Sequence, residues 1–84
     1  MVPVTIYTRN GCPYCTSAVN LLKKKGAAFT EHNASIEPQY RAEMMQKSGR
    51  NTFPQIFVGA KHVGGCDDLH ALDARGGLDP LLNG

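Results

Sequence analysis

The sequence is most informative first in what it has little of. It contains no tryptophan, and Lys and Arg exceed Asp and Glu by only 9 to 7. Such a small positive excess does not favour nucleic acid as a partner. No run of about 18 apolar residues is present, so we expect no membrane-spanning helix and no membrane partner. The first residues lack the basic segment and apolar stretch of a secretory signal peptide, which predicts the cytoplasm as location.

The 84 residues that are present are 42% hydrophobic, which argues against disorder. This length predicts a single domain over residues 1–84. The chain has three cysteines, and two of them form the motif Cys12-Pro13-Tyr14-Cys15. Disulfides in the cytoplasm are usually transient and catalytic rather than structural. The odd number of cysteines and the spacing of this pair are therefore the features to explain.

The hydrophobic pattern predicts an α/β fold with the element order β-α-β-α-β-β-α. The expected strands are residues 2–7, 28–32, 55–58 and 61–63, and the expected helices are an amphipathic stretch from Cys15 to the lysines 23–25, a helix opening at 35–38 and ending at 48–49, and residues 67–75. The leucines at 78, 81 and 82 are expected to pack the tail onto the core. Because the first crossover must be right-handed, the first two strands should be parallel, and the last two form a hairpin. We expect a four-stranded mixed sheet with three helices, distributed over both faces.

The cysteine pair lies where a strand ends and a helix begins. Pro13 suits the first helical position, because its missing N–H costs nothing there. The free N–H groups of Tyr14 and Cys15 should then point at the sulfur of Cys12, and these donors with the helix dipole favour a thiolate. Cys15 lies deeper along the helix. We therefore predict Cys12 as the nucleophile and Cys15 as the resolving thiol.

Two other interpretations of the cysteines stay open on spacing alone. Cys12 and Cys15 are three residues apart and, with Cys66 and His62, could complete a zinc site, but the two halves are separated far more widely than in ordinary zinc modules. A structural disulfide is the other alternative. A C-x-x-C motif that follows a strand in a β-α-β setting favours redox chemistry over both.

Two further motifs could form a binding groove. Pro54 precedes a strand, and a cis peptide bond there would turn the N–H and C=O of Phe53 outward, where they could pair with an extended peptide. The alternative is an ordinary trans proline at a strand start. In Gly64-Gly65-Cys66-Asp67-Asp68 a flexible backbone precedes a helix whose free N–H groups could hold a carboxylate, and the alternative is plain capping by one of the aspartates.

These motifs together resemble the glutaredoxin family, most closely its small bacterial dithiol members. The matching segments are Tyr7-Thr8-Arg9, Cys12-Pro13-Tyr14-Cys15, Thr52-Phe53-Pro54-Gln55-Ile56-Phe57, Gly64-Gly65-Cys66-Asp67-Asp68-Leu69 and the tail 71–78. The resemblance implies a thioredoxin fold and a glutathione-dependent thiol–disulfide oxidoreductase, an electron donor in cell redox homeostasis. Its substrates would be protein disulfides and protein–glutathione mixed disulfides.

The resemblance also implies which residues bind glutathione as co-substrate. They are Arg9, Tyr14, Arg41, Thr52, Phe53, Pro54, Gly65, Cys66, Asp67 and Asp68. Pro54 would be cis, and the backbone of Phe53 would pair with the cysteine part of glutathione. The N–H groups at Cys66 and Asp67, with an aspartate carboxylate, would hold the γ-glutamyl end. Arg9 and Arg41 would meet the glycine carboxylate, and Tyr14 would flank the tripeptide.

The expected partners are glutathione and glutathionylated or disulfide-containing proteins, with ribonucleotide reductase as an expectation of the family, and we expect a monomer without a bound metal. An iron–sulfur carrier, in which two chains share a cluster through Cys12 and two glutathiones, is an alternative that Pro13 disfavours. An inert binding module is another, and the intact cysteine pair argues against it. Arg50 and Asn51 depart from the residues usual before Thr52, and the sequence does not predict their role.

Overall fold

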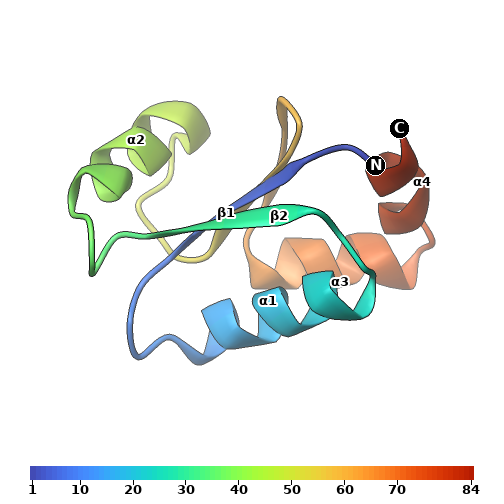
Figure 1. The fold of residues 1–84 in the computed structure, drawn as a ribbon, viewed down its shortest axis with the longest axis horizontal. Helices are drawn as coiled ribbons and strands as arrows, with labels where there is room; N and C mark the ends of the chain where they lie inside the picture. The colour runs from blue at the N-terminus through green and yellow to red at the C-terminus, as the bar shows by residue number, and fades with distance from the viewer.

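A computed structural model describes residues 1–84 and gives the elements in the order shown in Figure 1. They are β1 (Val4–Thr8), α1 (Pro13–Lys24), β2 (Phe29–Asn33), α2 (Gln39–Ser48), β3 (Gln55–Val58), β4 (Lys61–Gly64), α3 (Cys66–Ala74) and α4 (Leu78–Asn83). The predicted order β-α-β-α-β-β-α is confirmed, with one helix added at the end of the chain.

The four strands form one sheet in the order β2-β1-β3-β4. Strand β1 is parallel to β2, with Val4 opposite Phe29, and antiparallel to β3, with Val4 opposite Val58. Strands β3 and β4 form the expected hairpin, with a register shift between Ile56 and Phe57. The mixed sheet predicted from the crossover rule is therefore confirmed.

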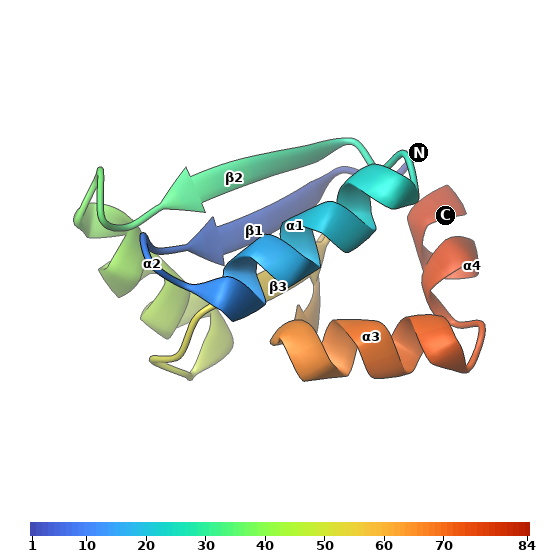
Figure 2. The ribbon, with the colours of Figure 1, turned by 90° about the horizontal axis from the view of Figure 1, so that it is seen from below.

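The helices cover both faces of the sheet (Figures 1 and 2). Helices α1 and α3 lie side by side on one face, and α2 lies on the other, behind the strands in Figure 2. The larger hydrophobic cluster fills the space under α1 and α3 and comprises Val4, Ile6, Ala18, Leu22, Ile56, Val58, Cys66, Leu69, Leu78 and Leu82. A smaller cluster of Tyr7, Met44 and Phe57 lies beneath α2. Alternate residues of β1 therefore pack into opposite cores, as the period of two of a strand requires.

The end of the chain differs from the prediction, which gave three helices. Residues 78–83 form α4, a six-residue helix that buries Leu78 and Leu82. The spacing of these two leucines places both on the side of the helix that packs against the core, and Pro80 falls in the first turn, where it costs no hydrogen bond. The N–H of Val2 donates to the carbonyl of Leu82 over 2.8 Å, so the two ends of the chain lie together.

The start of α2 also differs from the prediction. The helix begins at Gln39 rather than within residues 35–38. The side-chain oxygen of Asn33 accepts the N–H groups of Ser35 (2.8 Å) and Ile36 (3.3 Å), which holds the chain in a turn instead of a helix.

No helix in this fold combines the length and the apolar character that a membrane span requires.

Candidate thiol active site

Cys12 occupies the N-cap of α1, at the point where the loop after β1 ends. Its backbone is extended (φ −113°, ψ 100°), and Pro13 follows as the first helical residue, as predicted. The N–H of Cys15 donates to the Cys12 sulfur over 3.1 Å. A helix N-terminus carries unpaired donors and partial positive charge, so this position stabilises an anionic sulfur. Of the two predicted donors, Cys15 makes the hydrogen bond and Tyr14 does not.

Cys15 lies one turn further along α1 in a different environment. Its side chain is 4% exposed and belongs to the buried face of the helix. Burial, followed by the hydrogen bond with the Cys12 sulfur, raises the pKa of Cys15 to about 12. All three cysteines are free thiols. The two thiols of the motif are therefore unequal, with Cys12 at the helix terminus and Cys15 held protonated beneath it.

A groove lies beside Cys12 and has a volume of about 190 Å³. Its lining consists of Tyr14, Phe53, Pro54, Gly65, Cys66, Asp67 and Asp68. All seven belong to the ten residues that the resemblance assigns to glutathione. The fold thus brings together the first turn of α1, the loop before β3 and the first turn of α3.

The loop before β3 lines this groove with Phe53 and Pro54. The peptide bond between Phe53 and Pro54 is cis, as the resemblance implies. The Cys12 sulfur lies 4.0 Å from the carbonyl oxygen of Phe53. The N–H of Phe53 donates to no group in the chain, so it is free to pair with a bound molecule.

The first turn of α3 is capped by one of its two aspartates. The Asp68 carboxylate accepts the N–H of Gly65 over 2.9 Å and the guanidinium of Arg50 over 3.1 Å. These two interactions, the Gly65 hydrogen bond first, lower the pKa of Asp68. At Gly64 (φ +122°) a Cβ would lie 2.2 Å from that carboxylate, so only glycine fits.

The other aspartate of this turn is unengaged. The carboxylate of Asp67 has no hydrogen bond or ion pair. The N–H groups of Cys66 and Asp67 also have no partner within the chain, as expected for the start of a helix. Capping therefore falls to Asp68, while Cys66 and Asp67 line the groove with N–H groups that have no partner in the chain.

Three of the ten predicted residues do not line the groove itself. The guanidinium of Arg41, on α2, lies 5.7 Å from the centre of the Phe53 ring. Thr52 precedes Phe53 and lines a neighbouring hollow. Arg9 lines a hollow of about 320 Å³ that also contains Cys12 and Cys15. Neither Arg9 nor Arg41 forms an ion pair.

The zinc site that spacing alone left open finds no support in the geometry. The chain contains no group of three or more His, Cys, Asp or Glu side chains able to hold a metal ion, so the residues of the zinc hypothesis are not brought together.

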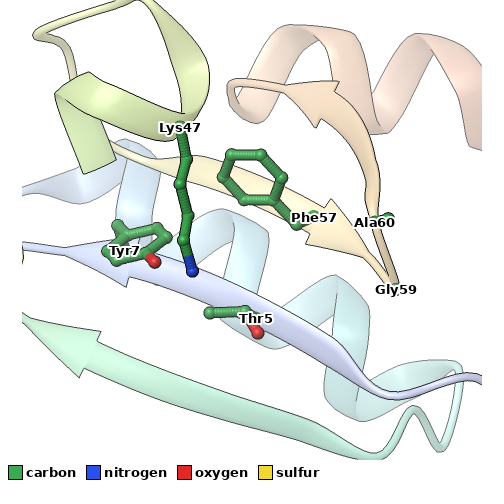
Figure 3. Close-up of a pocket in the computed structure, with 6 residues that line it drawn as sticks. All are labelled: Thr5, Tyr7, Lys47, Phe57, Gly59 and Ala60. Atoms are coloured by element: carbon green, nitrogen blue, oxygen red, sulfur yellow. The ribbon is translucent and has the colours of Figure 1, made fainter. Parts of the chain in front are cut away.

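Another hollow, of about 350 Å³, lies on the α2 side of the sheet, where Lys47 reaches between Tyr7 and Phe57 toward Thr5 (Figure 3). Its lining holds no cysteine.

Comparisons with known proteins agree with this geometry. The sequence profile described as Glutaredoxin matches residues 4–63. Glutaredoxin 3 of Escherichia coli (strain K12) is 57% identical over 82 residues, which cover 98% of this chain and 99% of that protein. The chain belongs to the glutaredoxin family. Its activity is that of the family, glutathione-dependent thiol–disulfide exchange.

Solved glutaredoxin structures match the fold over nearly the whole chain. The solution structure of glutaredoxin from Brucella melitensis is 65% identical and has a TM-score of 0.83, covering 98% of this chain and 89% of that one. A crystal structure of a buckwheat glutaredoxin–glutathione complex is 29% identical and has a TM-score of 0.88, covering 98% and 77%. The thioredoxin fold that the resemblance implies is thereby confirmed.

Sequence reasoning passed over three residues around this glutaredoxin site. Arg50 pairs with Asp68, and the buried Gln55 bonds both Thr52 and His62. Arg50 stood out only as a departure from the family pattern. A glutamine among the apolar residues of a strand was the available signal for Gln55, because a buried amide needs hydrogen-bond partners.

Proposed function

We propose that this glutaredoxin reduces protein–glutathione mixed disulfides and protein disulfides, with Cys12 as the nucleophile and Cys15 as the resolving thiol. One observation carries the assignment. The Cys12 sulfur accepts the N–H of Cys15 at the N-terminus of α1, whereas burial holds Cys15 protonated. The thiolate is the attacking species in disulfide exchange, so the first attack belongs to Cys12.

Glutathione would bind along the groove beside Cys12. The unpaired N–H of Phe53 would pair with its cysteine residue, as an added strand does. The free donors of Cys66 and Asp67 would hold the γ-glutamyl carboxylate at the start of α3. The buckwheat relative that was solved with glutathione supports this use of the groove.

The charges at the two ends of the groove suit the charges of the tripeptide. Arg9 and Arg41 have no ion-pair partner and would meet the glycine carboxylate. The unengaged carboxylate of Asp67 would meet the γ-glutamyl ammonium group. Tyr14, whose side chain is 64% exposed, would flank the bound molecule.

Removal of glutathione from a protein needs only Cys12. Its thiolate attacks the glutathione sulfur of the mixed disulfide, the protein thiolate leaves, and Cys12 becomes glutathionylated. The thiolate of a second glutathione attacks the glutathione sulfur on Cys12. Glutathione disulfide is released and the Cys12 thiolate returns, so one disulfide is reduced and one is formed.

Reduction of a protein disulfide needs both cysteines. Cys12 attacks one substrate sulfur, the other substrate thiolate leaves, and a mixed disulfide forms. Contact with the Cys12 sulfur is one cause of the raised pKa of Cys15, and it weakens once that sulfur is in a disulfide. Cys15 then attacks the Cys12 sulfur and gives up its proton to water, and the departing substrate thiolate takes up a proton, which releases the reduced substrate and leaves a Cys12–Cys15 disulfide.

The wider setting follows from the sequence and the family. We propose that residues 1–84 act as one monomeric domain in the cytoplasm, on glutathionylated and disulfide-containing proteins. Ribonucleotide reductase is the protein partner that the family resemblance implies.

The proposal is tested by measuring two activities of the same variants. The first is reduction of a small glutathione mixed disulfide, and the second is reduction of a protein disulfide, each with glutathione as the only reductant. We expect Cys12→Ser to lose both activities. We expect Cys15→Ser to keep the first and lose the second, because the resolving step is needed only there. Equal loss of both activities in Cys15→Ser would contradict the assigned roles.

A further inference from the structure

The loop that carries Phe53 has an unusual set of hydrogen bonds. Residues 50–54 take part in no backbone–backbone hydrogen bond. At its start, Ser48 Oγ accepts the N–H of Arg50 over 3.0 Å and donates to the carbonyl of Met44 over 2.7 Å. At its end, Gln55 holds Thr52 through its side chain. Side chains therefore determine where this loop lies.

Gln55 is a fully buried amide whose donors and acceptor are all satisfied. Its Nε2 donates to the Thr52 carbonyl over 3.1 Å and to the Thr52 hydroxyl over 3.2 Å. Its Oε1 lies 2.7 Å from Nε2 of His62. A carbonyl oxygen only accepts, so the atom bonded to Thr52 is the amide nitrogen, and the atom facing His62 is the amide oxygen.

The orientation of the Gln55 amide fixes the role of His62. An amide oxygen cannot donate, so Nε2 of His62 must carry the hydrogen of this bond. The His62 ring stacks on Phe57 with 4.8 Å between ring centres and an interplanar angle of 27°, which holds the donor in place. Burial and the charge of Arg50 lower the pKa of His62, and the charge of Asp68 opposes them.

The chain of hydrogen bonds from His62 through Gln55 ends at Thr52, next to the residue that contacts the Cys12 sulfur. Thr52 is joined directly to Phe53, whose carbonyl oxygen lies 4.0 Å from the Cys12 sulfur and whose N–H is free. A tilt of the Thr52 carbonyl changes the same peptide plane that carries the Phe53 N–H. The position of the Thr52–Phe53 peptide beside the groove thus depends on Gln55 and, through Gln55, on His62.

We propose that His62 is a positioning residue for this glutaredoxin: by donating to Gln55, it holds the Thr52–Phe53 peptide at the height where the Phe53 backbone pairs with the substrate. The inference rests on the proposed function, in which that backbone binds glutathione. His62 does not touch the substrate or the cysteines. Its effect should therefore fall on substrate binding and not on the sulfur chemistry.

Two substitutions at position 62 separate the hydrogen bond from the ring. His62→Phe keeps an aromatic ring against Phe57 but removes the donor, and His62→Gln keeps an N–H donor at similar reach. With a small glutathione mixed disulfide as substrate, we expect His62→Phe to raise KM by about fivefold to tenfold, the scale of leaving one buried acceptor unpaired. We expect kcat and the rate of Cys12 alkylation to stay within about twofold of wild type. His62→Gln should restore most of the KM.

Each other outcome has a definite meaning. An unchanged KM in His62→Phe, or a KM in His62→Gln as high as in His62→Phe, would overturn the inference, because the ring alone would then matter. A fall in kcat together with the rise in KM would also overturn the inference. A wild-type protein inactive on this substrate would instead reject the proposed function.

A second variant covers the case in which His62→Phe does not fold. Gln55→Met keeps the length of the side chain and removes both its donors to Thr52 and its acceptor for His62, at a residue that is not among those assigned to glutathione. We expect a rise in KM at least as large as in His62→Phe, about fivefold or more, with kcat unchanged. An unchanged KM in this folded variant would overturn the inference.

Discussion

At the scale of single residues, the central feature is the contrast between two thiols in one helical turn. Cys12 caps the helix and accepts a backbone N–H, whereas Cys15 lies in the buried face of α1, where burial outweighs the backbone hydrogen bond and the charge of Arg9 that act to lower its pKa. We propose that position relative to the helix terminus divides the roles of the two cysteines. In that proposal the same turn supplies both the attacking and the resolving sulfur.

This contrast predicts unequal alkylation by iodoacetamide. The pKa of Cys15 is raised to about 12, so its thiol keeps its proton at every lower pH and stays unreactive there. At about pH 8 we expect carbamidomethylation of Cys12 with Cys15 unmodified, read by peptide mass spectrometry. In Cys12→Ser, Cys15 should still resist, because burial is the largest cause of its raised pKa. Comparable rates at Cys12 and Cys15 would refute the assignment.

At the scale of elements, the start of α3 depends on one carboxylate. Asp68 closes the first turn on Gly65 and links α3 to the loop after α2 through Arg50. The ion pair is about half exposed on both sides, so solvent screens it. The hydrogen bond to Gly65 is the larger cause of the lowered pKa of Asp68, and we expect it to carry most of the effect.

A pH titration of stability tests this cap. A carboxyl whose pKa is lower in the folded chain stabilises the fold above its usual value of 3.8, and this contribution disappears as the pH falls through the folded value. We therefore expect Asp68→Asn to lower the urea midpoint near neutral pH, and the gap from wild type to close in acid. Asp67→Asn is the matched control, since its carboxylate has no partner, and should leave the midpoint unchanged. A gap that persists in acid would show that charge is not the cause.

Element boundaries show where local sequence was sufficient and where it was not. The predicted strand 55–58 matches β3, and Pro13 begins α1, because β-branched residues and a proline with a fixed role act locally. The start of α2 was misplaced because the Asn33 side chain competes for the N–H groups of Ser35 and Ile36. The helix α4 was missed because packing of its leucines on the core, and not length, stabilises it.

The candidate site divides in the same way. Residues adjacent in the chain, such as Cys12 and Cys15 or the turn 64–68, could be assigned from motifs. The pairs Arg50–Asp68 and Gln55–His62 join loops and strands that meet only in the folded chain. Spacing along the sequence carries no signal for such contacts, so they become visible only in the folded structure.

At the scale of the whole molecule, the site depends on the hydrophobic core, although the core residues themselves lie outside the site. Leu69 of α3 is fully buried in the cluster beneath α1 and α3, and α3 begins at the groove. We expect Leu69→Ala to cost about 2–5 kcal/mol of unfolding free energy, measured by urea denaturation. Ile36→Ala, at a side chain 72% exposed, is the control and should cost less than about 0.5 kcal/mol. Equal costs would contradict the assigned core.

The most direct test of the central claim is to trap the glutathionylated intermediate. Cys15→Ser is treated with glutathione disulfide, and the site of modification is mapped by mass spectrometry. Because Cys12 attacks and no resolving thiol remains, we predict one glutathione attached at Cys12 and no such adduct in Cys12→Ser. An adduct at Cys66 in place of Cys12, or no adduct at all, would contradict the account.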